Sequence, residues 1–270
     1  LPLLESAAEE VLRRATGGLD IGAHRHALRH LGASLAEFDE VVLTNDTWYG
    51  PVRPWEPVFA RMDRSACHFW GLTDHAAIRP NPLTRRGVAP YHLQSYWIAV
   101  RRPMFMSEAW RRYWERLPPL DSYVDAVLEH ELRFTDVFTA AGWVAAAAFP
   151  VEEFDTENPS LYEAESLVDR GCPALKRRPL FHWPPLLDSY GAVGAWTLES
   201  VAARGYPIDM ILKNLARTVP PKAMNVDVGL LTVLPPDGQP PPPSPSPAGP
   251  RGLVIVDRDG TPIDHLLRRA

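Results

Sequence analysis

A short apolar run that ends abruptly in polar residues most constrains the fold of this chain. The run Glu40–Leu43 is rich in β-branched residues and leads directly into Thr44-Asn45-Asp46-Thr47, after which Gly50-Pro51 forces a turn. Such a run is typical of a buried strand of the parallel type, the kind found in α/β proteins. Open α/β sheets bind ligands beyond the carboxyl ends of their strands, which makes Asp46 a candidate metal or substrate ligand. The alternative is that Asn45 and Asp46 cap the turn through side-chain hydrogen bonds to the backbone.

Helical and strand patterns alternate over residues 1–219, so the sequence predicts one domain of the α/β class. Apolar residues at helical spacing predict helices at about Leu3–Ala15, Ile21–Leu35, Trp55–Met62, Ser107–Arg116, Tyr123–Ala141, Leu161–Asp169 and Tyr206–Ala216. Apolar runs bounded by turn residues predict strands at Val41–Leu43, His68–His75, Tyr91–Val100 and Trp143–Phe149. Asp20 is expected to cap the second of these helices.

The composition changes sharply towards the C-terminus. Residues 220–234 are expected to form an extension with a strand over Val226–Leu234, and residues 235–250 contain little but Pro, Ser and Gly. That tract predicts an extended linker of the polyproline type, with an SH3-type ligand as the alternative. Residues 251–270 predict a strand at Leu253–Val256 and then a hairpin turn. Because a segment this short does not fold alone, this tail either docks back or begins a further domain.

Composition excludes several classes of protein. Of the 270 residues, 46% are hydrophobic and 23% are charged, values typical of a globular protein rather than a disordered one. The formal net charge of −5 gives no basic excess, so a nucleic-acid partner is not expected. No apolar run approaches the roughly 20 residues that span a bilayer. The cysteines, Cys67 and Cys172, predict neither a disulfide framework nor a metal site, and favour a reducing compartment.

A basic and histidine-rich cluster lies on the predicted helix Ile21–Leu35. Its members are His24, Arg25, His26, Arg29 and His30. No cysteine or carboxylate at metal-ligand spacing accompanies them within the helix, so a solvated helix face is the favoured interpretation over a metal site. A metal-dependent hydrolase that uses this cluster together with Asp74-His75 is the weakest of the functions considered, because no recognised ligand spacing supports it.

Polar and aromatic residues near the strand ends are candidates for sugar binding. His92, Gln94 and Tyr96 alternate along the predicted strand Tyr91–Val100, so they are expected to share one face and to line a sugar site. The other candidates are each open to a structural interpretation. Trp48 and Tyr49 would stack on a sugar or base, or else pack under the loop. Asp74 would serve as a ligand or belong to a plain turn, and Lys176 would pair with a phosphate or stay solvated.

Several separated segments together resemble the rhamnan synthesis F family, whose members are glycosyltransferases of bacterial cell-surface polysaccharide assembly. The most specific are Leu43–Pro51, which resembles an NDS-aromatic-YGP motif, and His92–Tyr96, which reads His-Leu-Gln-Ser-Tyr like the HLQSY motif. Supporting segments are Gly18–Gly22, Trp70–Asp74, His130–Thr135, Asn158–Pro159, Gly171–Arg177 and Tyr206–Ile208. The resemblance covers roughly residues 18–217.

The resemblance implies a fold, a substrate class and a cellular location. The implied fold is the GT-A-like (Rossmann-like) fold of nucleotide-diphospho-sugar transferases, here lacking its first N-terminal strands. The implied donor is dTDP-rhamnose, and the implied acceptor is a cell-surface polysaccharide or a lipid-linked glycan. The protein is then expected in the cytoplasm, with a peripheral position at the cytoplasmic face of the membrane as an alternative. The oligomeric state is not predicted.

The resemblance also implies roles for individual residues. Asp46 would hold a Mg²⁺ or Mn²⁺ ion against the diphosphate of the donor, with Asn45 beside it, although Thr44 stands where a first carboxylate would be expected. Glu131 would act as the general base in a single inverting displacement. Its rival Glu129 lies two positions away on the helix and would face another way. The alternative function is an inactive carbohydrate-binding or scaffolding remnant of such an enzyme.

Overall fold

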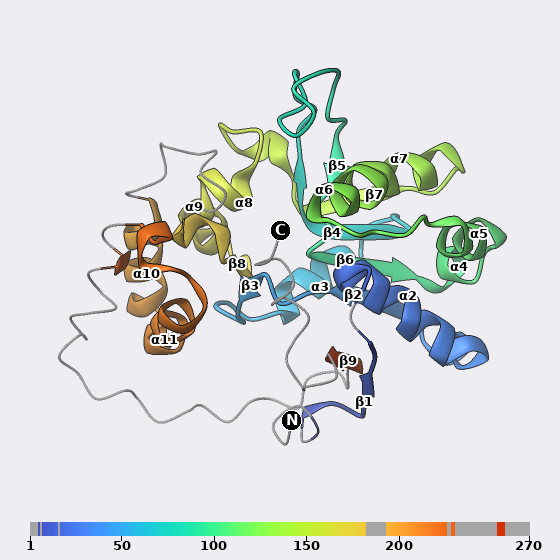
Figure 1. Ribbon diagram of the computed structural model, residues 1–270, viewed down its shortest axis with the longest axis horizontal. Helices are drawn as coiled ribbons and strands as arrows, with labels where there is room; N and C mark the ends of the chain where they lie inside the picture. The colour runs from blue at the N-terminus through green and yellow to red at the C-terminus, as the bar shows by residue number, and fades with distance from the viewer. Residues whose placement is uncertain are drawn as a thin grey trace. The chain divides into compact units, whose positions relative to one another are not determined.

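The computed structural model describes residue 5 and residues 7–15, 17–181, 193–225, 228–229 and 253–256 (Figure 1). The chain divides into two compact units. Unit 1 comprises residues 1–46, 65–148 and 246–270, and unit 2 comprises residues 47–64 and 149–245. The linker predicted over residues 235–250 and the hairpin turn of the tail lie outside the described residues. The boundaries predicted at residues 219, 234 and 250 therefore stay predictions.

Unit 1 contains a five-stranded mixed sheet, which confirms the mixed α/β class. Its strands are β2 (Glu40–Thr44), β4 (Phe69–His75), β5 (His92–Leu93), β6 (Trp97–Arg101) and β7 (Ala145–Phe149). The order is β2-β6-β4-β5, and β7 also pairs with β4. The pairs β2–β6, β6–β4 and β4–β5 are antiparallel. All of β4 except His75 is buried, so β4 forms the centre of this sheet.

Strand β2 departs from the buried parallel strand that its sequence predicts. It lies at the end of the described strand order and pairs antiparallel with β6, with Val42 opposite Ala99. Val42 is 39% exposed, and Leu43 is the buried residue of the strand. The prediction was wrong in orientation and burial because a three-residue apolar run fits a half-exposed antiparallel strand as well as a buried parallel one.

The helices of unit 1 include those predicted at Ile21–Leu35, Ser107–Arg116 and Tyr123–Ala141, with differences at their ends, and one short helix at residues 102–105 that the sequence did not predict. They are α2 (Leu19–Leu31) followed by the 3₁₀ turn Gly32–Glu37, α4 (Arg102–Phe105), α5 (Glu108–Arg116), α6 (Tyr123–Ala126), a π-helical turn (Val127–Glu131) and α7 (Leu132–Ala140). Gly18, in the left-handed conformation with φ 71°, precedes α2, so Asp20 lies in the first turn rather than at the cap. Single π turns inside helices are frequent at functional sites, which draws attention to residues 127–131.

An aromatic core joins the helices of unit 1 to its sheet. Phe69 of β4 lies 5.8 Å from Phe134 of α7, measured between ring centroids, and Phe134 lies 4.8 Å from Phe138. Trp110 of α5 contacts both of these α7 rings and Trp114. Such ring pairs add about 0.5–1.5 kcal/mol each beyond the burial of their area, so they fix α5 and α7 on the sheet.

The N-terminal segment forms a strand where the sequence predicts a helix. Strand β1 (Glu10–Arg13) pairs in parallel with β9 (Leu253–Val256), so Glu10 lies opposite Leu253. The strand predicted at Leu253–Val256 is thereby confirmed, and it docks on the N-terminal segment. The helical pattern of Leu3–Ala15 misled at residues 10–13 because a partner strand from the far end of the chain supplies the backbone hydrogen bonds there.

Unit 2 is mainly helical. Its elements are β3 (Trp48–Tyr49), α3 (Glu56–Met62), α8 (Pro159–Tyr162), α9 (Ala164–Asp169), β8 (Leu175–Lys176), α10 (Val193–Ala203), α11 (Ile208–Thr218) and 3₁₀ turns at Val151–Glu153, Arg178–Leu180 and Pro221–Ala223. Strands β3 and β8 pair antiparallel. Val168, Leu198, Ile211 and Leu215 are fully buried in its core. Helix α10 was missed by sequence reasoning. Within the described parts of both units, no helix is long and apolar enough to cross a membrane.

Candidate active site

A polar cluster forms where strand β2 ends, and it uses residues from three segments of unit 1. The side-chain amide of Asn45 donates a hydrogen bond to Oδ2 of Asp20, in the first turn of α2, at 2.6 Å. The backbone N–H of Asn45 donates to the carbonyl of Tyr96 at 3.2 Å, and the hydroxyl of Thr44 donates to the same carbonyl at 2.9 Å. Thr44, found where a carboxylate was expected, therefore joins β2 to the segment between β5 and β6.

His24 extends this cluster along α2. Its Nε2 lies 2.8 Å from the carbonyl oxygen of Thr44 and donates to it, since a carbonyl only accepts. Its Nδ1 is buried and has no hydrogen-bond partner among the described residues. The rest of the predicted basic cluster disperses, because His30 pairs with Glu10 at 2.8 Å while Arg25, His26 and Arg29 line a cavity. The predicted solvated helix face therefore describes these residues only in part.

Glu131 approaches the cluster from the π-helical turn. Its Oε2 accepts a hydrogen bond from the backbone N–H of Ser95 at 3.0 Å and another from the hydroxyl of Ser95. Ser95 directly precedes Tyr96, whose carbonyl binds the end of β2. Glu129 instead pairs with Arg133 at 2.6 Å in an exposed position. The two glutamates therefore face different ways, as their spacing predicts.

The buried ring of His130 lies under this cluster. Its Nδ1 is 2.7 Å from the hydroxyl of Tyr113. The pKa of His130 is lowered to about 4, chiefly by burial and also by the charge of His24, whereas the carboxylates of Asp20 and Glu131 act in the opposite direction. Asp20 and His24 of α2 and Glu131 of the π-helical turn therefore all act on this one ring.

The predicted sugar-lining residues do not share one strand face, because the predicted strand Tyr91–Val100 is two strands. Strand β5 ends at Leu93 and β6 begins at Trp97, so residues 94–96 form a break between them. Within this break the backbone N–H of Ser95 donates to the side chain of Glu131 instead of to a neighbouring strand. The side chains on either side of Ser95 form a buried network. The hydroxyl of Thr73 donates to Oε1 of Gln94 at 2.6 Å and, with its one proton so used, accepts from the hydroxyl of Tyr96 at 2.9 Å.

His92 lies apart from Gln94 and Tyr96. Its ring stacks on His75, with 5.1 Å between the ring centroids and 15° between the planes, and its Nδ1 donates to the carbonyl of Pro90. His92, Gln94 and Tyr96 are all buried, and they support the segment that binds the end of β2. Their role in lining a sugar site stays a prediction.

Asp74, at the end of β4, is buried and accepts a hydrogen bond from the hydroxyl of Tyr91 at 2.9 Å. Asp74 and His75 are the residues that the hydrolase hypothesis needs for a metal site. Among the described residues, however, no group of three or more His, Cys, Asp or Glu side chains is placed to hold a metal ion. The same holds for the histidines of α2, so the structure gives the hydrolase hypothesis no support.

Asp46 is an exposed carboxylate at the last residue of the first segment of unit 1. Since it is not part of a preformed group of three such ligands within the described chain, the protein side chains alone do not build a metal cage. A single carboxylate fits only an ion that completes its shell with water and the phosphate oxygens of a substrate, as Mg²⁺ commonly does. Asp46 meets that weaker requirement.

Three predicted site residues belong to unit 2. Trp48 lies opposite Lys176 in the pairing of β3 with β8, and its ring meets the edge of Trp55 at 5.9 Å between centroids. The hydroxyl of Tyr49 donates to Oδ1 of Asn214 at 2.8 Å, and Nζ of Lys176 lies 3.4 Å from Oγ1 of Thr47. These contacts hold β3 within unit 2, and any stacking of Trp48 or Tyr49 on a ligand stays a prediction.

Sequence reasoning missed three members of the cluster, namely His24, Ser95 and His130, and assigned Asp20 a capping role. Asp20 lies 25 positions from its partner Asn45, and Ser95 lies 36 positions from Glu131. No local spacing links such pairs. The available signal was that Asp20, Asn45, Ser95 and Glu131 all fall inside segments that carry the family resemblance.

The fold and these contacts define an α/β protein with a carboxylate-rich polar cluster at the end of a sheet strand. The family model of rhamnan synthesis protein F matches residues 2–235. The chain belongs to this family, which implies a role in the synthesis of rhamnose polysaccharides. No curated protein and no solved structure matches the chain. The mixed α/β fold therefore rests on the sheet itself, and its GT-A subtype stays a prediction.

Proposed function

We propose that this protein is a glycosyltransferase that moves a deoxyhexose, rhamnose, from dTDP-rhamnose to a cell-surface polysaccharide or a lipid-linked glycan. Family membership supports the link to rhamnose polysaccharides. The observation that carries the proposal is that Asn45, held by Asp20, and Glu131 both bind the segment Ser95-Tyr96 beside the end of β2. Carboxylates gathered beyond a strand end are suited to binding a sugar and moving a proton.

In this proposal Glu131 is the general base. The acceptor hydroxyl attacks the anomeric carbon of the donor while Glu131 takes the hydroxyl proton. The new carbon–oxygen bond forms as the bond to the diphosphate breaks, and the nucleoside diphosphate leaves with the bonding electrons. Attack opposite the leaving group inverts the anomeric configuration. The two hydrogen bonds from Ser95 to Oε2 fix the orientation of the Glu131 carboxylate, which favours such a proton transfer.

Asp46 is proposed to contact the donor diphosphate through a divalent ion, Mg²⁺ or Mn²⁺. When bound, such an ion would offset the negative charge that develops on the leaving diphosphate. Asn45, held by Asp20, fixes the backbone from which Asp46 projects. The proposed substrate-binding residues are His92, Gln94, Tyr96, Asp74, Trp48, Tyr49 and Lys176.

Steady-state transfer from dTDP-rhamnose to a polyprenyl-linked glycan acceptor tests the assignment of the site. Glu131→Gln keeps an oxygen that can accept from Ser95 but removes the base, so we expect kcat to fall about 10²–10⁴-fold while donor affinity is kept. Glu129→Gln, two positions away and exposed, is the matched control and should stay active. Asp46→Ala should lose activity with an unchanged melting temperature. Full activity in both Asp46→Ala and Glu131→Gln would refute the assignment.

A non-catalytic, carbohydrate-binding remnant is the second candidate, and Thr44 at the position where a first carboxylate would be expected favours it. Thermal melting separates the two functions, because a ligand that binds only the folded state raises the melting temperature. The transferase should respond to dTDP-rhamnose with Mn²⁺ rather than to UDP-sugars or GDP-sugars. The melting temperature of a remnant should rise with glycan alone and with none of the nucleotide sugars.

A further inference from the structure

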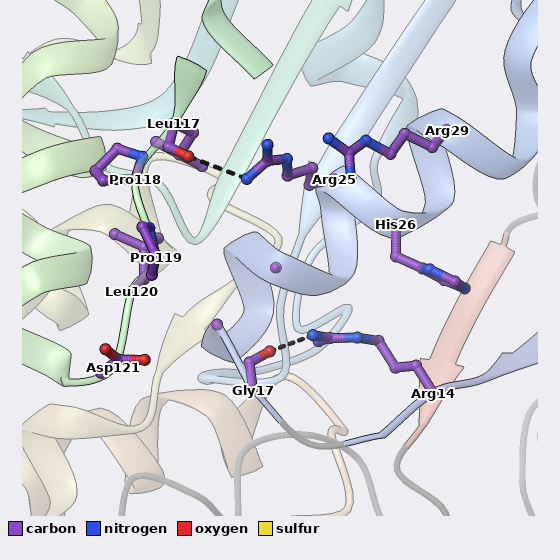
Figure 2. Close-up of a pocket in the computed structure, with 12 residues that line it drawn as sticks. Arg14, Gly17, Arg25, His26, Arg29, Leu117, Pro118, Pro119, Leu120 and Asp121 are labelled. Carbon is purple, nitrogen blue, oxygen red and sulfur yellow. Dashed lines mark hydrogen bonds between the residues drawn. The ribbon is translucent and has the colours of Figure 1, made fainter. Parts of the chain in front are cut away.

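A cavity of about 290 Å³ lies beside the amino-terminal end of α2 in unit 1 (Figure 2). One wall is the turn Gly17-Gly18 with Gly22, and the facing wall is the segment Leu117–Asp121. Its charged and titratable lining consists of Arg14, Arg25, His26, Arg29 and Asp121. Three guanidinium groups therefore share this cavity with one carboxylate.

Two of these guanidinium groups bind backbone carbonyls rather than carboxylates of the described residues. Arg14 donates to the carbonyl of Gly17, and Arg25 donates to the carbonyl of Leu117 at 3.0 Å (Figure 2). Arg14 also donates to the carbonyl of Leu19, and Arg25 to that of Glu115 at 2.9 Å. Backbone carbonyls carry no net charge, so they leave the positive charge in place. Within the described residues, neither these two nor Arg29 forms an ion pair with Asp or Glu.

Other arginines of the same unit behave differently. Arg111 and Arg112 of α5 both pair with Glu108, and Arg133 pairs with Glu129. The cavity is thus a place where positive charge exceeds negative charge, with three guanidinium groups and one carboxylate in its lining. Burial lowers the pKa of both Arg14 and Arg25, and the charge of Arg29 lowers that of Arg25 further. A bound anion would relieve both the desolvation and the mutual repulsion.

The backbone at this wall packs closely against Arg14. A Cβ atom on Gly22 would lie 2.9 Å from the carbonyl oxygen of Gly17, closer than real contacts allow, and 3.1 Å from Nη2 of Arg14, which is tighter than most real contacts. Gly18, which precedes α2, has no side chain to cap the first turn, where the backbone N–H of Ile21 donates to Oδ1 of Asp20 at 2.9 Å.

We propose that this cavity binds the phosphate or diphosphate group of a substrate. Arginine forks match phosphate oxygens in pairs of hydrogen bonds, which makes a cluster of three unpaired arginines suited to such an anion. The volume is at the lower end of the range for ligand pockets, so it fits a diphosphate group rather than a whole nucleotide sugar. Binding of the anion stands by itself, whereas the identity of the substrate rests on the proposed transferase function.

Calorimetric titration with inorganic pyrophosphate tests the site without any turnover. The guanidinium of Arg29 forms no hydrogen bond or ion pair within the described residues, so Arg29→Glu should fold normally. We expect Arg29→Glu and Arg14→Gln each to weaken pyrophosphate binding about tenfold or more. Arg86→Glu, at an exposed position of the same unit, changes the net charge as Arg29→Glu does and should leave the affinity within about twofold of the wild type. Melting temperatures verify that all variants are folded.

Three outcomes would overturn the proposal: no binding by the wild type, unchanged binding in both cavity variants, or equal weakening by Arg86→Glu. Competition then distinguishes the sources of the anion. Displacement of pyrophosphate by thymidine diphosphate would place the donor in the cavity, and displacement by vesicles that carry a polyprenyl diphosphate would place the acceptor there. Displacement by neither would refute a substrate diphosphate. Pyrophosphate binding without any rhamnose transfer would refute the transferase function and keep the anion site.

Discussion

The side-chain amide of Asn45 donates a 2.6 Å hydrogen bond to the carboxylate of Asp20, and this contact joins the end of strand β2 to the first turn of helix α2. Both residues belong to the polar cluster of the candidate site. Asp20 also acts on the buried ring of His130, and Asn45 binds the carbonyl of Tyr96 through its backbone. The contact therefore links the polar cluster to the wall of the cationic cavity, since Asp20 follows Gly18 by two residues.

Asn45→Ala should lower the free energy of unfolding by about 1.5–3 kcal/mol, because a part-buried hydrogen bond to a charged group is lost. Asp20→Asn keeps an acceptor oxygen and should cost less than Asp20→Ala. Urea unfolding of Asn45→Ala, Asp20→Ala and the double variant gives the coupling between the two residues. We expect a coupling of about 0.5–3 kcal/mol, and additive effects would show that the contact contributes nothing.

His130 should make the protein less stable as the pH falls from about 6.5 to about 4. The unfolded histidine titrates near pH 6.5, whereas burial lowers the pKa in the folded protein to about 4. Between these values the unfolded chain binds more protons, so stability is full above pH 6.5 and is lost as the pH approaches 4. The loss amounts to roughly 3 kcal/mol.

Urea unfolding at several pH values checks this prediction. The quantity compared between variants is the slope of the free energy of unfolding against pH. His130→Gln should remove this part of the pH dependence, whatever it does to the stability at pH 7. His26→Gln, at an exposed position, serves as the control and should leave the slope unchanged. Equal slopes in the wild type and in His130→Gln would contradict the assignment.

Thr73→Val should destabilise unit 1 by about 1–3 kcal/mol while keeping the shape of the side chain. The hydroxyl of Thr73 binds both Gln94 and Tyr96 in a buried network, and valine removes both hydrogen bonds. Amide hydrogen exchange at residues 94–96 should become faster. Thr139→Val is a control, because its hydroxyl binds only the backbone of its own helix. If Thr73→Val lowers the free energy of unfolding no more than Thr139→Val does, the result would contradict a stabilising role for the network.

Gly22→Ala should destabilise the protein, which is the opposite of the ordinary effect in a helix. Replacing glycine by alanine inside a helix normally stabilises by about 1 kcal/mol. Here the new methyl group would lie 2.9 Å from the carbonyl of Gly17 and 3.1 Å from Arg14, so we expect a net loss of about 1–3 kcal/mol. Thermal unfolding gives the sign of the stability change. A higher melting temperature would contradict the close packing of Gly22 against Gly17 and Arg14.

The sequence by itself determined the elements whose signals are local. Helix α3 forms at Glu56–Met62 where its apolar spacing predicts it, and Ser107 caps α5 by accepting from the backbone N–H of Trp110. Strand β4 and the β9 segment follow their apolar runs. The motif segments indicated the family, and the family model confirms it over residues 2–235. Each of these depends on residues that are neighbours along the chain.

Tertiary structure decided the rest, because distant partners supplied the hydrogen bonds. Residues 10–13 became a strand since β9 offers its backbone groups, and β2 became an antiparallel strand since β6 lies beside it. The predicted strand Tyr91–Val100 is divided at residues 94–96, where the backbone N–H of Ser95 donates to the side chain of Glu131. The pairing of Asp20 with Asn45 and the gathering of unpaired arginines beside α2 likewise join residues far apart in the chain. Spacing along a sequence indicates which residues share one face of a helix or strand. Only packing decides which distant group contacts that face.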